Sequence, residues 1–123
     1  MPGSSIRHEV SFLKDILAAC RKIRTIVATT SEDAFLKDEV LPAAVLHHLT
    51  VIGEAISRLP VELRERHPAV PWRQIVAVRN RIVHAYFELD WQILWDAATG
   101  DIPELRRQVL DILTTEFSES ESD

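Results

Sequence analysis

Apolar residues recur every three or four positions along almost the whole chain, and this period most constrains the fold. Stripes of this kind run through the start, the middle and the end of the sequence: Ile6, Val10, Leu13, Leu17, Cys20 and Val27; Leu41, Val45, Leu49, Ile52, Ile56 and Leu59; Ile102, Leu105, Val109, Ile112, Leu113 and Phe117. That spacing gathers side chains on one face of an α-helix, whereas strand-like alternation is nowhere sustained. With 46% apolar residues and only 3 glycines, the sequence predicts an all-α globular protein.

Capping residues place the helix boundaries in the first half of the chain. Ser4 or Ser5 is expected to cap a long first helix, and Ser31 to cap a short second one. A third helix is expected over residues 39–59, with Pro42 in its first turn, where a missing N–H is tolerated.

Prolines, a glycine and an aspartate divide the second half. Pro60 begins a further helical turn, and the two prolines of segment 67–71 make it a rigid connector. The remaining helices are expected over residues 72 or 73 to 85, 91–99 and 102–117. Asp90 is expected to cap the second of these helices and Gly100 to end it.

Four main helices with short connections imply a largely up-and-down helical bundle with short extra helical turns. The length fits one domain, expected over residues 1–117, followed by a disordered tail at 118–123 that holds only serines and acids.

The longest apolar runs fall short of a membrane span and the first residues lack signal-peptide features, so we expect a cytoplasmic protein with no membrane contact. The single cysteine, Cys20, excludes an internal disulfide and is expected to be a buried core thiol.

Positive charge is concentrated in one stretch, although the net charge is −5. Residues 58–84 contain six arginines and two glutamates, and the rest of the chain is strongly acidic. An excess of arginine over lysine favours bidentate recognition of phosphate or carboxylate. The sequence leaves open a plainer alternative, in which Arg64 and Arg66 are solvated and pair with Glu62 and Glu65.

The run from Arg79 to Tyr86 concentrates residues that can carry chemistry. Asn80 and His84 are four positions apart, so both side chains point from one face of a helix. Arg79 precedes His84 by five positions, which is roughly 140° around the axis, so one undistorted helix cannot bring both to one small group. Two copies of the helix meeting across a twofold axis would share the residues of a cleft, and we therefore expect a homodimer.

These residue types suit cleavage of an RNA phosphodiester by its own 2′-hydroxyl, without a metal. His84 would remove the hydroxyl proton or protonate the leaving oxygen. Arg79 would hold the phosphate, and Asn80 would orient either group. Arg73 and Arg81, on the same helix, are candidate RNA-binding residues. Spacing alone leaves open that Arg79 pairs with a carboxylate, Asn80 faces solvent and His84 fills a helix end.

The pattern of Arg79, His84 and Tyr86 resembles the R-x4-H-x-Y signature of the HEPN superfamily, in the branch of HepT-like toxins of toxin–antitoxin pairs. Further blocks resemble that branch in the same order: residues 51–55, 63–68, 71–72, 86–87, 93–95 and 101–103. One position departs, because the family often carries an arginine near His47, which lies here between Leu46 and His48. The role of that arginine is therefore not transferred to this chain.

The resemblance implies an all-helical, metal-independent endoribonuclease that works as a homodimer without a cofactor, with Arg79 and His84 catalytic and Asn80 in the polar position of the motif. It also implies a partner, a minimal nucleotidyltransferase antitoxin that transfers AMP onto the tyrosine matching Tyr86. A nucleotide two residues from His84 would bring bulk and negative charge against the arginines that bind RNA. The alternative for Tyr86 is an amphipathic side chain at a helix end.

Other residues have less specific interpretations. Gly53, inside a helix, is expected to admit another helix closely, and Glu54 either pairs with an arginine of the motif helix or is solvated. The adjacent His47 and His48 diverge by about 100° and are expected to be structural or exposed.

The three tryptophans, Trp72, Trp91 and Trp95, are expected to be core or interface anchors, although an exposed one could stack on an RNA base. A competing function remains, in which the same dimer face only docks a nucleotidyltransferase or a nucleotide and the chain is catalytically inactive.

Overall fold

A computed structural model of the chain describes residues 2–86 and 91–117, with the backbone alone for residues 2–6, 79 and 82–86. All secondary structure in these two segments is helical: α1 (Pro2–Ala28), α2 (Glu32–Lys37), α3 (Val40–Arg58), α4 (Val61–Arg66), α5 (Trp72–Tyr86), α6 (Trp91–Asp96), the π-helical turn η1 (Ala97–Asp101) and α7 (Ile102–Thr115). The predicted all-α fold is confirmed. The predicted cap at Asp90 and the predicted tail at 118–123 lie outside the described residues.

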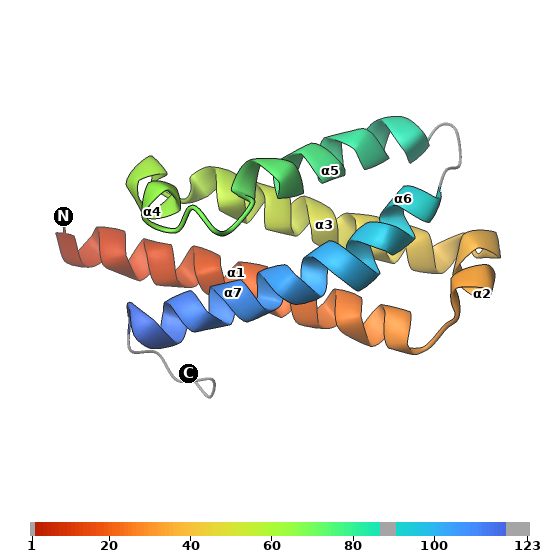
Figure 1. The fold of residues 1–123 in the computed structure, drawn as a ribbon, viewed down its shortest axis with the longest axis horizontal. Coiled ribbons are helices and arrows are strands. Elements are labelled where there is room, and N and C mark those ends of the chain that lie inside the picture. The colour runs from red at the N-terminus through yellow and green to blue at the C-terminus, as the bar shows by residue number, and fades with distance from the viewer. Residues whose placement is uncertain (1, 87–90, 118–123) are drawn as a thin grey trace.

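The four long helices α1, α3, α5 and α7 alternate in direction and form an up-and-down bundle (Figure 1). α1 packs against α3 and α7, and α3 packs on its other side against α5. The short helix α4 lies at one end of the bundle, while α2 lies at the other end and contacts α6. The predicted bundle is therefore confirmed for one chain, and the predicted homodimer stays a prediction.

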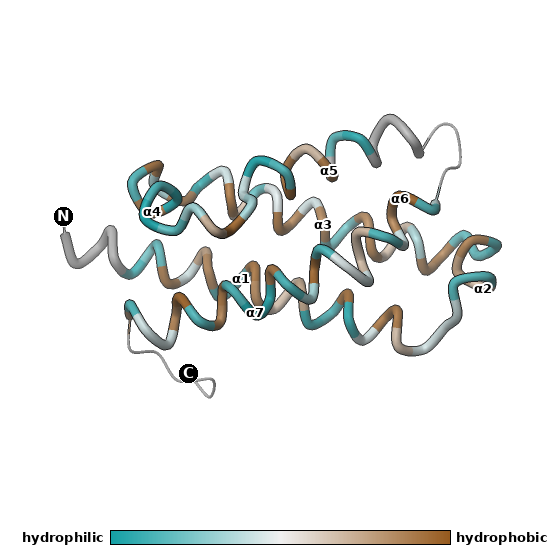
Figure 2. Tube along the Cα trace, viewed as in Figure 1, coloured by the Kyte–Doolittle hydropathy of each residue, from teal (hydrophilic) through white to brown (hydrophobic). Residues whose placement is uncertain are grey.

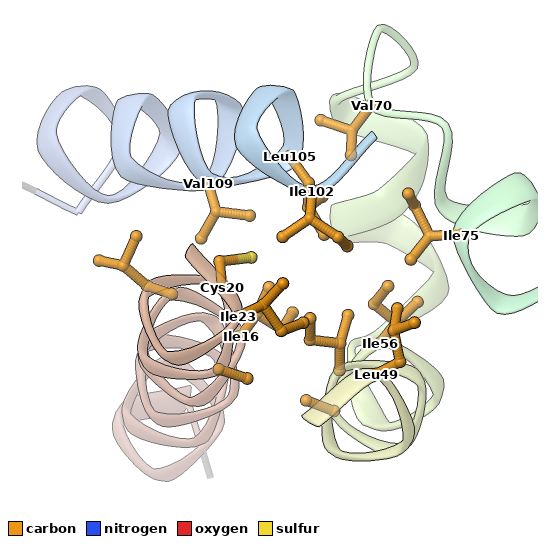
Figure 3. Packing of buried hydrophobic residues seen from close by; sticks show 14 of the residues in the cluster. Ile16, Cys20, Ile23, Leu49, Ile56, Val70, Ile75, Ile102, Leu105 and Val109 are labelled. Atoms are coloured by element: carbon orange, nitrogen blue, oxygen red, sulfur yellow. The ribbon is translucent and has the colours of Figure 1, made fainter. Parts of the chain in front are cut away.

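The apolar stripes of the four long helices meet in one core, as the hydropathy colouring indicates (Figure 2). Figure 3 shows this packing for residues from all four helices and the connector before α5: Ile16, Cys20, Ile23, Leu49, Ile56, Val70, Ile75, Ile102, Leu105 and Val109. α2 closes one end through Phe35, which is fully buried with its ring 5.1 Å from that of Trp95. Cys20 is buried and free, as predicted.

α3 is the most apolar of the four long helices by its average composition. By length and composition alone it is apolar enough to cross a membrane, although its uninterrupted apolar runs are short, as predicted. In the fold, however, its apolar stripe of Val45, Leu49, Ile52 and Ile56 is buried. These residues belong to the core that α3 shares with α1 and α5. A core helix of this kind satisfies the same length and composition test.

The first helix begins earlier than expected. α1 starts at Pro2, so Ser4 and Ser5 lie inside it and do not cap it. Proline is favoured at the first helical position because its fixed φ suits the helix and its missing N–H has no intrahelical partner there. The cap predicted at Ser31 is confirmed, since its hydroxyl accepts a hydrogen bond from the backbone N–H of Ala34 at 3.2 Å.

Gly100 does not end a helix, contrary to prediction. The chain runs from α6 through η1 into α7, and the N–H of Ile102 donates to the carbonyl of Ala97, five residues back. Pro103 explains this turn, because a proline inside a regular helix lacks the N–H that would bond to the carbonyl of Thr99 and its ring clashes with that carbonyl. A π-turn rearranges the carbonyls just before such a residue. Gly100 is exposed and does not take the left-handed conformation that commonly ends helices.

Candidate functional site

α5 is an unbroken helix from Trp72 to Tyr86 that carries the whole predicted motif. Its regular geometry places Asn80 and His84 one turn apart along the same face, while Arg79 occupies a different angular position. For Arg79, His84 and Tyr86 the description is limited to the backbone. The convergence of Arg79 and His84 across a second copy therefore stays a prediction.

The start of α5 is anchored in the core through Trp72, which is 6% exposed. Its indole N–H donates to the carbonyls of Arg64, at 3.3 Å, and His67, at 3.2 Å. One turn further on, Ile75 is 3% exposed, and its N–H donates to the carbonyl of Pro71 at 3.0 Å. α5 is thus tied to α4 and the connector at its first turn, and the predicted anchoring role of Trp72 is confirmed.

Further along α5, the helix has an apolar side and a polar side. Val78 is partly buried against the core, as predicted. Arg73, Asn80 and Arg81 are exposed. The predicted RNA-binding arginines are therefore accessible to a large ligand on the surface of the bundle. Ile82, the third predicted core residue of this helix, has only its backbone described.

Two adjoining hollows lie beside α5, and both are lined by Pro71 and Gln74. The first, of about 430 Å³, lies between α4 and the start of α5 and is lined by Arg64 and Arg73. The second, of about 290 Å³, continues along α5 toward the motif and is lined by Arg81. We call the two hollows together the α5 groove. It was not predicted, because its walls come from segments that only the fold brings together.

Arg64 and Arg66 do not behave as the plainer sequence interpretation proposed. Arg66 bonds to Glu116 at the end of α7, with Nε 2.9 Å and Nη2 2.5 Å from Oε1, so its pairing with Glu62 or Glu65 is wrong. Arg64 is half-buried, lines the α5 groove, and has a buried Nε with no hydrogen-bond partner. A distant carboxylate thus takes the place of the neighbours that the sequence suggested for Arg66.

His67 joins the same carboxylate, since its Nε2 is hydrogen-bonded to Oε2 of Glu116. We call Arg66, His67 and Glu116 the α4–α7 clamp. Burial acts to raise the pKa of Glu116, but the hydrogen bonds from His67 and Arg66, together with the charges of both, outweigh it and lower that pKa. The clamp fixes α4 to the end of the bundle, and α4 in turn holds the tryptophan from which α5 starts.

The other residues considered from the sequence lie on α3 and α6 rather than on α5. His47 is exposed and His48 partly buried, as expected, with ring centroids 5.0 Å apart. Burial, then the charges of His47 and Lys22, lower the pKa of His48. Glu54 is exposed, which favours its solvated alternative.

The tryptophans of α6 also agree with expectation, because Trp91 and Trp95 are partly buried against the core. Gly53 is buried in α3, and the close approach of another helix to it stays a prediction. Among the described residues no group of three or more histidine, cysteine or acidic side chains is arranged to hold a metal ion.

Comparison with known proteins gives a consistent picture. A family model described as "Ribonuclease HepT-like" matches residues 16–112, a span that includes all of α5. A relative in Caldanaerobacter subterraneus subsp. tengcongensis named as a "Putative RNase" is 40% identical over 105 residues, which are 85% of this chain and 94% of the relative. A "Putative RNase" of Methanocaldococcus jannaschii is 32% identical over 122 residues, 99% of this chain and 98% of the relative. A "Probable ribonuclease HepT" of Thermococcus cleftensis is 34% identical over 100 residues, 81% and 91% respectively. No solved structure matches the chain significantly.

Proposed function

Because the chain belongs to the ribonuclease HepT-like family, as its motif predicted, we propose that it is a metal-independent endoribonuclease toxin that cleaves cellular RNA at a cleft between two copies of the chain. Arg79 and His84 are the catalytic residues, and Asn80 orients them. Arg73 and Arg81 hold the RNA backbone. The observation that carries this proposal is the unbroken α5, which bears the whole motif, has Asn80 exposed, and has the exposed Arg73 and Arg81 along a groove.

The reaction needs one proton acceptor and one proton donor. The imidazole of His84 takes the proton of the ribose 2′-hydroxyl, and the 2′-oxygen then attacks the adjacent phosphorus. The bond from phosphorus to the 5′-oxygen of the next nucleotide breaks, and that oxygen takes a proton from a water molecule, whose hydroxide is then neutralised by the proton that His84 has gained. The products are a 2′,3′-cyclic phosphate and a 5′-hydroxyl. Arg79 offsets the charge that develops on the non-bridging oxygens in the transition state.

Helical geometry supports the two-chain cleft. Arg79 and His84 are five positions apart on a regular helix, about 140° around its axis, so one copy cannot aim both at one phosphate. A twofold axis beside α5 would supply the missing group from the second copy. The exposed Arg81, which lies within the motif and lines the α5 groove, would then hold the strand that leaves the cleft.

Tyr86 is the proposed point of regulation by a minimal nucleotidyltransferase antitoxin. The phenolic oxygen attacks the α-phosphate of ATP, pyrophosphate leaves and the phenolic proton goes to solvent, so AMP becomes bonded to the tyrosine. Tyr86 is the last residue of α5, two positions after His84. Each added phosphate carries about one negative charge, which competes with RNA for the arginines and inhibits the toxin without unfolding it.

The test of catalysis is cleavage of a labelled RNA by the purified protein in the presence of a chelator. The wild type is expected to cut and to leave cyclic phosphate ends. Arg79→Ala and His84→Ala are each expected to lower the rate on the order of 100-fold or more. His47→Ala on α3 and Arg107→Ala on α7 are matched controls, because both side chains are exposed on other helices. A wild type that never cuts would favour the inactive docking module, and cutting abolished by the chelator would contradict metal independence.

Mixing inactive variants tests the shared cleft. Arg79→Ala and His84→Ala protomers, unfolded together and refolded, are expected to recover roughly a quarter of wild-type activity, because half of the dimers are mixed and each holds one complete site. No recovery, with dimers verified by light scattering, would mean that both groups act from one chain. A separate assay with the antitoxin, ATP and Tyr86→Phe checks the modification: the wild type is expected to gain AMP and the variant to gain none.

A further inference from the structure

A further cavity lies between α1 and the start of α7. It has a volume of about 260 Å³ and is lined by Cys20, Arg24, Ala98, Ile102, Pro103 and Arg106. Its residues come from α1, η1 and α7, and none of them lines the α5 groove, so the two hollows are distinct. We call it the α1–α7 cavity.

Among the residues that the structure describes, the charged ones that line this cavity are two arginines, Arg24 and Arg106. Within the described part of the chain, neither forms an ion pair or a side-chain hydrogen bond, and the buried Nε of Arg106 has no partner. The next residue, Arg107, is different: it bonds to Glu104 with Nε–Oε1 2.8 Å and Nη2–Oε2 2.6 Å. Two guanidinium groups beside one hollow without a carboxylate repel each other, and an anion between them would remove that repulsion.

The inner wall of the cavity is apolar and uncharged. Cys20 is 0% exposed and both Ala98 and Ile102 are 1% exposed. Burial raises the pKa of the Cys20 thiol to about 12, although the nearby charge of Arg106 acts to lower it. The thiol is therefore neutral near pH 7 and supplies no negative charge to offset the arginines.

The shape and charge of the cavity indicate which anion it would hold. A guanidinium fork matches the oxygens of a phosphate and binds them through two parallel hydrogen bonds. A hollow of about 260 Å³ lies just below the usual range for pockets that enclose a whole drug-sized molecule, so it suits a phosphate and the atoms next to it. We propose that the α1–α7 cavity binds a phosphate group between Arg24 and Arg106. The group belongs either to a small phosphate or nucleotide or to a nucleic-acid strand.

The test uses nuclear magnetic resonance titration of the full chain with three probes: inorganic phosphate, AMP, and a short DNA oligonucleotide that lacks the 2′-hydroxyl needed for cleavage. We expect saturable shifts of the backbone amides of Cys20, Ala98 and Ile102 with at least one probe. Saturation by inorganic phosphate or AMP identifies a small ligand, and shifts with the oligonucleotide alone identify a strand. The absence of shifts at these amides with all three probes would overturn the proposal.

Variants give the second readout. Arg24→Gln and Arg106→Gln are each expected to weaken binding at least tenfold, because each removes one guanidinium from the anion. Arg107→Gln is the matched control and is expected to bind as the wild type does. Equal weakening by Arg106→Gln and Arg107→Gln would mean a diffuse charge effect and contradict a built site. Should Arg106→Gln fail to fold, the exposed Arg24 carries the comparison with Arg107→Gln.

Discussion

Glu116→Gln gives the sharpest test of how α4 is held to the bundle. The change keeps the size and shape of the side chain but removes the charge that accepts hydrogen bonds from Arg66 and His67. Charge-assisted hydrogen bonds contribute about 1.5–3 kcal/mol each where they are protected from solvent. Here the side chains of Arg66 and Glu116 are 43% and 27% exposed, so solvent screening reduces that contribution. We expect the variant to lose about 1–2 kcal/mol of unfolding free energy near pH 7.

For a domain of this size, that loss lowers Tm by roughly 4–8 °C. The pH dependence has a defined sign, because the folded-state pKa of Glu116 is lowered. The stability that its charge contributes is fully present above the unfolded pKa of about 4.3 and is lost as pH falls through the lower folded value. The difference between wild type and variant should therefore shrink as the pH falls below about 5.

Urea unfolding followed by circular dichroism, from pH 7 down to the lowest pH at which the wild type folds, measures this difference. Glu104→Gln is the matched control, since Glu104 lies on α7, pairs with its neighbour Arg107, and has a side chain that is 53% exposed. It should change stability much less than Glu116→Gln. Equal effects of the two variants, or a Glu116 difference that persists in acid, would refute the reasoning.

Three further outcomes follow from other parts of the molecule. Phe35→Ala should cost about 3–5 kcal/mol in urea unfolding, because the ring is fully buried against Trp95; a loss under about 1 kcal/mol would mean that α2 is not part of the core. Cys20, with its pKa raised to about 12 by burial, should not react with a thiol reagent near pH 8 until the protein is unfolded in urea; fast reaction of folded protein would contradict its burial. Arg73→Gln and Arg81→Gln should each lower the salt dependence of RNA binding by about one phosphate contact, measured by fluorescence anisotropy; an unchanged slope for both would remove them from the RNA-binding surface.

The helices could be predicted because their causes are local. A period of three to four residues and the hydroxyl of Ser31 act within one or two turns of the chain, and sequence spacing reports them directly. The continuous run from α6 to α7 could not be predicted in that way. Gly100 and Pro103 each indicate a break when taken alone, yet buried Ala97 and Ala98 hold the turn against the core and a π-turn accommodates the proline.

The charged contacts were less predictable because their partners are far apart in the sequence. Arg66 meets Glu116 across 50 positions, whereas local reasoning offered two nearby glutamates instead. The α1–α7 cavity was also not predicted. Its two arginines, Arg24 and Arg106, are far apart in the sequence, and both lie outside the basic stretch of residues 58–84. The position of the motif on one helix was predictable, because it depends on the period of that helix alone.

The anchor of α5 and its motif lie far apart along the helix. Changes at the anchor should therefore affect stability, and changes at the motif should affect activity. Trp72 fixes the first turn, and His84 lies 12 positions later, about 18 Å along the axis. Loss of the α4–α7 clamp loosens the segment before that first turn, while α5 keeps its packing against α3 and α6. Glu116→Gln should therefore lower Tm and leave the rate of RNA cleavage per folded molecule unchanged at a temperature well below Tm. His84→Ala should do the opposite, abolishing cleavage with little change in Tm. A Glu116→Gln protein that is fully folded but cleaves much more slowly would mean that the start of α5 controls the motif directly, contrary to the argument.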